Sequence, residues 1–262
     1  MANRKVGARM DAFTTLLEWV KKSEKITILT GAGMSTDSGI PDFRSEDGVW
    51  QDKVLFSAMN ASYLRQNPEP FWPRFKRAFM SERYLKAKPN VGHEILAWLE
   101  TAGKNITVIT QNVDGLHQQA GSTRVFEVHG TTRTATCPSC HTTYDQNYVL
   151  AHDIPRCQAK TPVGPCDTVL WPDVVLFDQP VRSFGDALDA VIHADLMIVL
   201  GTSLEVHPVA DLPTYRPLST KLVIINLDET ALDALADLVI HAPISEVLLT
   251  LSRCFGKEDE LR

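Results

Sequence analysis

The chain has 262 residues, 44% of them hydrophobic, which is enough for one large domain or for a domain with a small insert. Its formal net charge is −6 and its basic residues are scattered, which argues against non-specific binding to nucleic acid or to an anionic membrane. The basic N-terminus leads into a polar, helix-like segment instead of a signal-peptide core, and no apolar stretch could cross a bilayer. We therefore expect a cytoplasmic protein with no direct nucleic-acid or membrane partner.

The first predicted elements are an amphipathic helix over about residues 8–22 and an apolar strand over residues 26–30. The strand ends in Gly31-Ala32-Gly33, and glycines at such a point let backbone N–H groups approach a bound phosphate because no Cβ stands in the way. Small polar residues follow, and residues 41–44 then read Pro-Asp-Phe-Arg. This stretch predicts a nucleotide-binding turn with a lid of its own.

The rest of the chain alternates between regular and irregular stretches. Residues 41–90 are rich in prolines and aromatic side chains, which favours short helices and loops, and residues 131–171 carry most of the cysteines and show little periodicity. Elsewhere apolar strands alternate with helices, which is typical of a parallel sheet covered on both faces. The predicted helices cover residues 91–101, 183–193 and 247–255, and the further predicted strands cover residues 106–110, 174–177, 196–200, 222–225 and 238–240.

These patterns predict an α/β fold with a doubly wound parallel sheet and two inserts. The sheet domain comprises residues 1–40, 91–130 and 172–262. A small domain comprises a helical insert, residues 41–90, and a cysteine-bearing insert, residues 131–171. Both inserts leave the sheet after strands, so we expect them to meet near its carboxyl edge, where open α/β sheets bind ligands.

Four cysteines lie within thirty residues of one another. Cys137 and Cys140 form a C-x₂-C turn, and Cys157 and Cys166 follow as a second pair. Two such pairs in a cytosolic chain indicate a structural zinc site, and four thiolates leave no open position for catalysis. The second pair is more widely spaced than usual, so its intervening residues must form an excursion that returns Cys166 to the metal. His141 as the fourth ligand and four unrelated thiols are the alternatives.

The remaining cysteine and most histidines have simpler interpretations. Cys254 falls on the apolar face of the last predicted helix, so we expect a buried core thiol. His93 and His117 are interpreted as surface or packing residues. His129 immediately precedes the cysteine-bearing insert, where a histidine is well placed as a general base near neutral pH, although a structural role is the alternative.

Polar residues follow three more predicted strands. Gln111, Asn112, Val113 and Asp114 suit a carboxamide-bearing ligand, or else form a plain strand–helix turn with Asp114 as its cap. Residues 201–203 suit phosphate or ribose contact, and residues 226–228 suit ribose hydroxyls, with a connecting loop as the alternative for each. Together these strand ends favour one nucleotide cleft.

Taken in order, the motifs GAGMSTDSGIPDFR, TQNVDGLH, VHG, CPSC, WPDVVLF, GTSLEV and VIINLDE resemble the sirtuin family of NAD-dependent protein-lysine deacylases. They span about residues 25–245. The resemblance implies a Rossmann-like NAD-binding domain, a small domain with one structural Zn²⁺, and an acylated-lysine protein or peptide in the cleft between them. The implied reaction releases nicotinamide and O-acyl-ADP-ribose, and we expect a monomer.

The resemblance also implies roles for individual residues. His129 would be the general base, with Asn112 as a second catalytic residue, and Cys137, Cys140, Cys157 and Cys166 would bind zinc. The backbone of Val174, Val175, Leu176 and Phe177 would pair with an extended substrate peptide. NAD would be bound by Gly31, Ala32, Gly33, Ser35, Thr36, Asp42, Phe43, Arg44, Gln111, Asn112, Val113, Asp114, Gly201, Thr202, Ser203, Asn226, Leu227 and Ile244.

Two departures from the family pattern bear on the substrate. Sirtuins commonly carry Phe-Gly-Glu where this chain has Phe177-Asp178-Gln179, which affects the expected peptide contacts. The Tyr-x-x-Arg pair of succinyl- and malonyl-removing sirtuins has no counterpart in residues 71–75, which favours an acetyl or another uncharged acyl group, although Arg74 and Arg77 lie nearby.

Other activities remain as alternatives. An ADP-ribosyltransferase or NAD hydrolase would share the scaffold and the release of nicotinamide, and a non-catalytic NAD-binding module would share the cleft. A dehydrogenase is disfavoured because the first turn lacks G-x-G-x-x-G.

Overall fold

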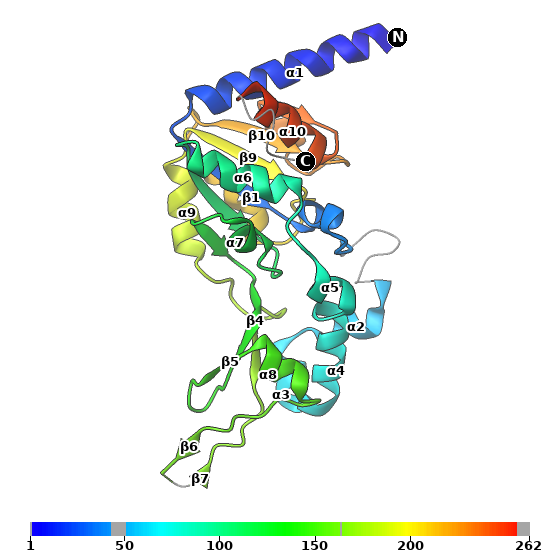
Figure 1. Cartoon of the computed structure of the whole chain (residues 1–262), viewed down its shortest axis with the longest axis vertical. Helices are drawn as coiled ribbons and strands as arrows, with labels where there is room; N and C mark the ends of the chain where they lie inside the picture. The colour runs from blue at the N-terminus through cyan, green and yellow to red at the C-terminus, as the bar shows by residue number, and fades with distance from the viewer. Residues whose placement is uncertain (1, 43–50, 163, 256–262) are drawn as a thin grey trace.

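The structure is a computed structural model that describes residues 2–42, 51–162 and 164–255, with side chains described from residue 11 onward. A sheet flanked by helices forms one end of the molecule, and a smaller part with short helices and a long hairpin forms the other (Figure 1). Among the described helices, none has both the length and the apolar character needed to cross a bilayer.

The main sheet is parallel throughout, which confirms the predicted fold class. It has six strands in the order β11-β10-β9-β1-β2-β3. The strands are β1 (Lys25–Thr30), β2 (Asn105–Thr110), β3 (Val125–Glu127), β9 (Leu196–Leu200), β10 (Lys221–Ile225) and β11 (Leu238–Ile240). Strand β3 was missed in the sequence because it has three residues, all of them half-buried at the edge of the sheet.

Helices cover both faces of this sheet. On one face α1 (Ala2–Lys22), α6 (Val91–Thr101) and α10 (Ile244–Cys254) enclose a core with alternate strand residues such as Ile26 and Ile28. On the other face α9 (Phe184–Ile192) and the 3₁₀ segment η4 (Val209–Tyr215) enclose a second core that includes Leu29. A short helix, α7 (Leu116–Ala120), packs beside α6.

The two inserts fold together into the smaller part. The helical insert contains α2 (Lys53–Ala58), α3 (Ala61–Gln66), α4 (Pro68–Phe79) and α5 (Glu82–Lys86). The cysteine-bearing insert contributes α8 (Gln146–Ala151), the hairpin of β6 (Lys160–Thr161) and β7 (Gly164–Pro165), and the sheet β5-β4-β8. The strands of that sheet are β4 (Gly130–Thr136), β5 (Thr143–Asp145) and β8 (Trp171–Val174).

One apolar core joins these inserts. Phe71, Trp72 and Phe75 of α4 are fully buried in it together with Val149 and Leu170 of the cysteine-bearing insert. The indole N–H of Trp72 donates to the Leu170 carbonyl oxygen over 3.2 Å, so its one polar atom is satisfied across the same interface. Side chains of the two inserts therefore pack in one shared core.

Two local predictions were wrong. The strand predicted over residues 174–177 ends at Val174, because the chain then leaves the small sheet and Phe177 instead bridges to Asn60 of the helical insert. Cys254 is exposed instead of buried, because Leu251 and then Phe255 supply the apolar contacts of α10 in its last turns.

The chain reverses its order of winding between β1 and β9, and the turns after these two strands touch there. Gly31 N donates to Leu200 O over 3.1 Å and Gly33 N donates to Gly201 O over 2.9 Å. A Cβ on Gly33 would lie 2.8 Å from the Gly201 Cα, and Gly201 itself has a φ of +61°. Only glycine allows this backbone contact, which brings two strand ends together at the switch point of the sheet.

We expect Gly33→Ala to lower the free energy of unfolding by about 2 kcal/mol, because the added methyl group overpacks a backbone contact. Gly185→Ala is the matched control, since a Cβ at that helical position meets nothing within 4 Å and should stabilise the protein by about 0.5 kcal/mol. Urea denaturation at pH 7 measures both variants. Equal stabilities would contradict the close approach.

Candidate active site and metal centre

A buried polar cluster joins the turns after β1 and β2. The Asn112 side-chain amide donates to the Gly31 carbonyl oxygen over 2.9 Å and to Ser35 Oγ over 3.1 Å. Ser35 Oγ in turn donates to Asp114 over 2.7 Å, and Asp114 also accepts from the Leu116 amide. The structure therefore brings together four of the predicted site residues, Gly31, Ser35, Asn112 and Asp114, from two segments almost eighty positions apart.

Burial changes the acidity of this cluster. Desolvation raises the pKa of Asp114 above its ordinary value, and the hydrogen bonds from Leu116 and Ser35 offset part of that rise. A half-buried carboxylate that already accepts two hydrogen bonds can orient a donor such as a carboxamide NH₂ or a ribose hydroxyl. Val113, between Asn112 and Asp114, is 4% exposed and gives the cluster an apolar wall.

His129 lies beside the same cluster through Gln111. Its Nδ1 is 3.1 Å from the Gln111 carbonyl oxygen, and the Gln111 side-chain amide donates to Thr202 Oγ1 over 2.9 Å. A carbonyl oxygen can only accept, so Nδ1 of His129 carries the proton and Nε2 is left as the basic nitrogen. The hydrogen bond from Gln111 to Thr202 also joins the end of β2 to the end of β9.

The environment keeps His129 in its neutral form. Burial lowers the pKa of the imidazole, and the hydrogen bond to Gln111 raises it in part. A neutral imidazole with an oriented ring and a basic Nε2 can accept a proton at pH 7, which is what a general base must do.

The other predicted nucleotide contacts lie around this edge of the sheet. Thr202 is 8% exposed after β9, and Leu227, which follows β10, is 67% exposed and accessible to a ligand. Asn226 donates from its side chain to the Asp228 carbonyl oxygen over 2.8 Å. Ile244 begins α10 and packs against the core of the main sheet instead of standing alone.

Four more predicted contacts belong to the turn after β1 and its continuation. Thr36 is exposed, with its hydroxyl donating to the Gly33 carbonyl oxygen over 3.0 Å, and Asp42 is half-buried. Phe43 and Arg44 lie outside the described residues. Ala32 and Ser203 are half-buried at the two facing turns, and their contacts with NAD stay a prediction.

The segment predicted to bind the substrate peptide has its amides already engaged. Val175 N donates to the His129 carbonyl oxygen over 2.8 Å, and Leu176 N donates to Gln179 Oε1 over 2.9 Å. Phe177 N donates to the Met59 carbonyl oxygen over 2.9 Å. A peptide that pairs with this segment must therefore donate its N–H groups to the carbonyl oxygens of the segment, or displace the Gln179 side chain from the Leu176 amide.

Asp178 anchors this segment to the helical insert. Its carboxylate accepts from the Ala61 amide over 2.8 Å, from the Ser62 amide over 3.2 Å and from the Ser62 hydroxyl over 2.6 Å. The Ser62 hydroxyl is the largest cause of the lowered pKa of Asp178. Asp178 has a φ of +71°, a left-handed conformation that glycine adopts more readily. Where sirtuins commonly have glycine, this chain therefore has an aspartate whose side chain makes hydrogen bonds that glycine cannot make.

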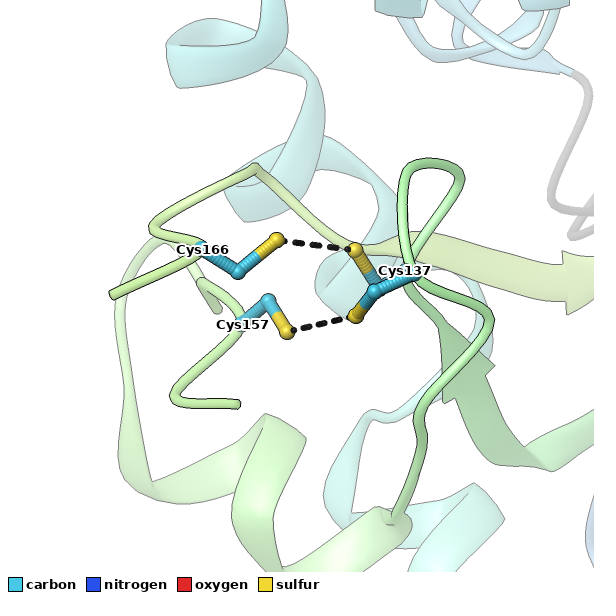
Figure 2. Close-up of side chains that lie close together, drawn as sticks. Cys137, Cys157 and Cys166 are labelled. Carbon is cyan, nitrogen blue, oxygen red and sulfur yellow. Dashed lines mark hydrogen bonds between the residues drawn. The ribbon is translucent and has the colours of Figure 1, made fainter. Parts of the chain in front are cut away.

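The four cysteines predicted as metal ligands form one cluster. Their sulfur atoms all lie within 4.8 Å of one another (Figure 2). The Sγ atoms of Cys137 and Cys166 are 3.6 Å apart, as one dashed line in Figure 2 marks, and those of Cys140 and Cys157 are 3.4 Å apart. Four converging thiols fit the tetrahedral preference of zinc.

The spacing of the second pair is explained by a hairpin. β6 and β7 pair between Cys157 and Cys166, and Cys166 N donates to the Ala159 carbonyl oxygen over 2.9 Å. The chain therefore leaves the cluster after Cys157 and returns to it at Cys166, which is the excursion that the wide spacing required. His141 is exposed and is not a member of the cluster, so Cys166 is the fourth candidate ligand.

Two buried polar residues near these turns were not singled out by the sequence. His93 and His117 are 0% and 1% exposed, and His117 Nε2 lies 3.0 Å from Oγ1 of Thr30, the last residue of β1. Desolvation lowers the pKa of His93 to about 4 and that of His117 to about 3. The only signal in the sequence was the position of His117 within TQNVDGLH.

Comparisons with known proteins agree on one family. The Sir2 family profile matches residues 31–208. NAD-dependent protein deacetylase 2 of Geobacillus kaustophilus is 44% identical over 249 residues, covering 93% of this chain and 98% of that protein. NAD-dependent protein deacetylase of Bacillus subtilis is 44% identical over 246 residues, covering 92% of this chain and 98% of that protein.

Solved structures are similar over nearly the whole chain. A structure of Sir2 with a p53 peptide and NAD⁺ has a TM-score of 0.80 at 34% identity, covering 93% of this chain and 98% of that one. A structure of Sir2Tm bound to a propionylated peptide has a TM-score of 0.80 at 34% identity, covering 94% of this chain and 99% of that one.

We expect Cys166→Ser to reduce bound zinc from about one ion per chain to near zero, because a hydroxyl is a poor replacement for the fourth thiolate. Cys254→Ser is the matched control, since that exposed thiol lies outside the cluster. Metal content by mass spectrometry, after dialysis against a weak chelator, measures both. Retention of zinc by the Cys166 variant would contradict its role as a ligand.

We expect the protein to lose stability as the pH falls from 7 to 5.5. His93 and His117 stay neutral in the folded state, with pKa values of about 4 and about 3, whereas the unfolded chain binds protons below about 6.5. Stability is therefore fully present above pH 6.5 and falls by about 1 kcal/mol per histidine between pH 7 and 5.5.

Urea denaturation at the two pH values, with zinc content monitored, measures this slope. His93→Gln should show a shallower slope than the wild type, because one of the two buried imidazoles is then missing. A wild-type stability that rises towards pH 5.5 would contradict the neutral, buried state of the pair.

Proposed function

Because this chain belongs to the Sir2 family, we propose that it is an NAD-dependent protein-lysine deacylase whose general base is His129. The observation that carries the assignment of the base is the bond between His129 Nδ1 and the Gln111 carbonyl oxygen, which leaves Nε2 available to accept a proton. The activity is supported by similarity to proteins named NAD-dependent protein deacetylase, which extends over almost the full length of the chain.

The polar groups at the carboxyl edge of the sheet fit NAD. Asn112, Ser35 and Asp114 form a buried donor and acceptor set suited to the carboxamide and ribose, and the turn of residues 31–33 suits the diphosphate. When bound, NAD would supply the ribose that takes the acyl group and the nicotinamide that leaves. His129 Nε2 would accept a proton from a ribose hydroxyl, and the Gln111 carbonyl oxygen would hold the imidazole ring in place during that transfer.

The partners of two arginines in the helical insert favour an uncharged acyl group, acetyl or another, over a carboxylate-bearing one. Arg74 donates to the Pro70 carbonyl oxygen over 2.7 Å and lies over the ring of Tyr63. Arg77 pairs with Asp52. Both arginines that the sequence left as possible partners of a negatively charged acyl group therefore have other partners, and the Sir2Tm structure with a propionylated peptide is consistent with a neutral acyl chain.

Zinc would be held by Cys137, Cys140, Cys157 and Cys166. Its part is to stabilise the small domain, because four thiolates leave no position open for substrate. We also propose that the protein works as a monomer in the cytoplasm. A cluster of four cysteines with the spacing of a zinc site is typical of a protein in a reducing compartment, where disulfides are rare.

We expect His129→Ala to lower the rate of lysine deacylation by about 10²–10⁴-fold, which is the usual contribution of a general base. NAD binding and zinc content should stay near wild type, and His193→Ala should keep full activity because its imidazole is exposed. Mass spectrometry of the products from NAD and a panel of acyl-lysine peptides measures the rate and the acyl preference together.

Two outcomes would contradict this assignment. Unchanged turnover in the His129 variant would reject the base. Rapid nicotinamide release from NAD alone, without an acylated peptide, would favour an NAD hydrolase. Faster removal of succinyl than of acetyl groups would overturn the acyl preference alone.

We expect Asp178→Gly to raise the KM for the acylated peptide about fivefold without changing the KM for NAD, because it removes hydrogen bonds that hold residues 175–179 against the helical insert. Asp178→Asn should have a smaller effect, since asparagine tolerates the left-handed conformation and can still accept hydrogen bonds. Steady-state kinetics with each substrate varied in turn measures the effect. Wild-type values in both variants would show that the anchor does not matter for peptide binding.

A further inference from the structure

Two histidines lie in the interior behind the turn that follows β1. His93 belongs to α6 and His117 to α7, and their ring centroids are 4.7 Å apart. His93 Nε2 and His117 Nδ1 have no hydrogen-bond partner among the described residues. Buried polar atoms are paired in the great majority of cases, so these two call for an explanation.

The hydrogen bonds around His117 decide which of its nitrogens carries the proton. Thr30 Oγ1 donates to Thr110 Oγ1 over 2.8 Å and lies 3.0 Å from His117 Nε2. A hydroxyl has one hydrogen, so Thr30 can only accept from His117, and Nε2 carries the proton. In the neutral ring Nδ1 is then an acceptor.

His93 has the same tautomer for an independent reason. The backbone amide of Asn90 donates to His93 Nδ1 over 3.3 Å, within the capping box that begins α6. Nδ1 therefore bears no proton, and Nε2 is the donor of the neutral ring. The two atoms without partners, His93 Nε2 and His117 Nδ1, are thus a donor and an acceptor that complement each other.

Both ends of this series of groups hold the turn after β1. At one end the Asn90 side chain donates to the Met34 carbonyl oxygen over 2.8 Å. At the other end Thr110 Oγ1 accepts from the backbone N–H of Asn112 over 3.0 Å. The side chain of Asn112 donates to the Gly31 carbonyl oxygen over 2.9 Å. The series therefore joins the first residue of the turn to a residue on its far side.

We propose that His93 and His117 form a directed hydrogen-bond relay, from Asn90 to Thr110, that holds both sides of the NAD-binding turn in position. The central link passes from the Nε2–H of His93 to Nδ1 of His117 through one buried water, because the two nitrogens do not bond each other directly. Both histidines are positioning residues, because they act on NAD through Asn90 and Asn112. The inference rests on the proposed function in that the turn must bind NAD.

Nitrogen-15 NMR of the zinc-loaded protein tests the relay without any substrate. Histidine tautomers are read from the chemical shifts of the two ring nitrogens, with His93→Gln and His117→Gln used for assignment. We expect both rings to be neutral at pH 7 and to carry their proton on Nε2. A proton on Nδ1 of either ring would overturn the relay, because the link would then no longer run from a donor on His93 to an acceptor on His117.

Calorimetric titration with NAD tests the positioning role. We expect His117→Met to weaken NAD binding about fivefold, as for one lost hydrogen bond, and His117→Gln to recover most of the affinity because its amide can still donate to Thr30. Thr30→Val and Thr30→Ser form a second matched pair with the same expected order. The KM for the acylated peptide should stay unchanged in all four variants.

The outcomes separate the relay from the proposed function. Equal NAD affinity in His117→Met and His117→Gln, together with equal affinity in the Thr30 pair, would overturn the positioning role. A variant that fails to fold is replaced by the other pair, since Thr30→Ser and Thr30→Val differ from the wild type by one small group each. A wild-type protein that binds no NAD would instead overturn the proposed function, and the tautomers would still be measurable.

Discussion

The contact between two glycine turns at the carboxyl edge of the sheet is the constraint on which the rest of the site depends. Gly33 N–H meets the Gly201 carbonyl oxygen where the winding of the chain reverses, and neither position has room for a side chain. This contact fixes the turn after β1 against the end of β9. The neighbouring strand β2 can then place Asn112 against Gly31, and Gln111 against Thr202. A looser contact would leave these side chains without fixed partners.

Burial at this edge accounts for the chemistry of the site. The sheet beneath is enclosed by apolar side chains on both faces, so polar groups at its end are partly removed from water. Desolvation raises the pKa of Asp114 and lowers that of His129, in each case favouring the neutral form. Hydrogen bonds from Ser35 and to Gln111 offset part of the cost. Burying Asp114 and His129 therefore costs stability but sets the protonation states of these two side chains.

The smaller part of the molecule contributes by position instead of by chemistry. Its two inserts share one apolar core, and the cluster of four cysteines lies within and against that core. His129 lies where the chain passes from the main sheet into the small one, and its carbonyl oxygen accepts from the Val175 amide on the return crossing. Asp178 then joins that return crossing to the helical insert. The place of the imidazole thus depends on how both inserts fold.

The sequence by itself determined the parallel sheet, the group of four cysteines and the polar residues at the strand ends, because each follows from a local pattern of apolar strands, cysteine pairs or small residues. Tertiary structure alone decided the edge strand β3, the end of β8 at Val174, the exposure of Cys254, the partners of Asp178 and the pairing of His93 with His117. These features depend on which distant residues come into contact. Short-range periodicity carries no information about such contacts, since burial and hydrogen-bond partners are set only when the sheet, the helices and the two inserts pack together.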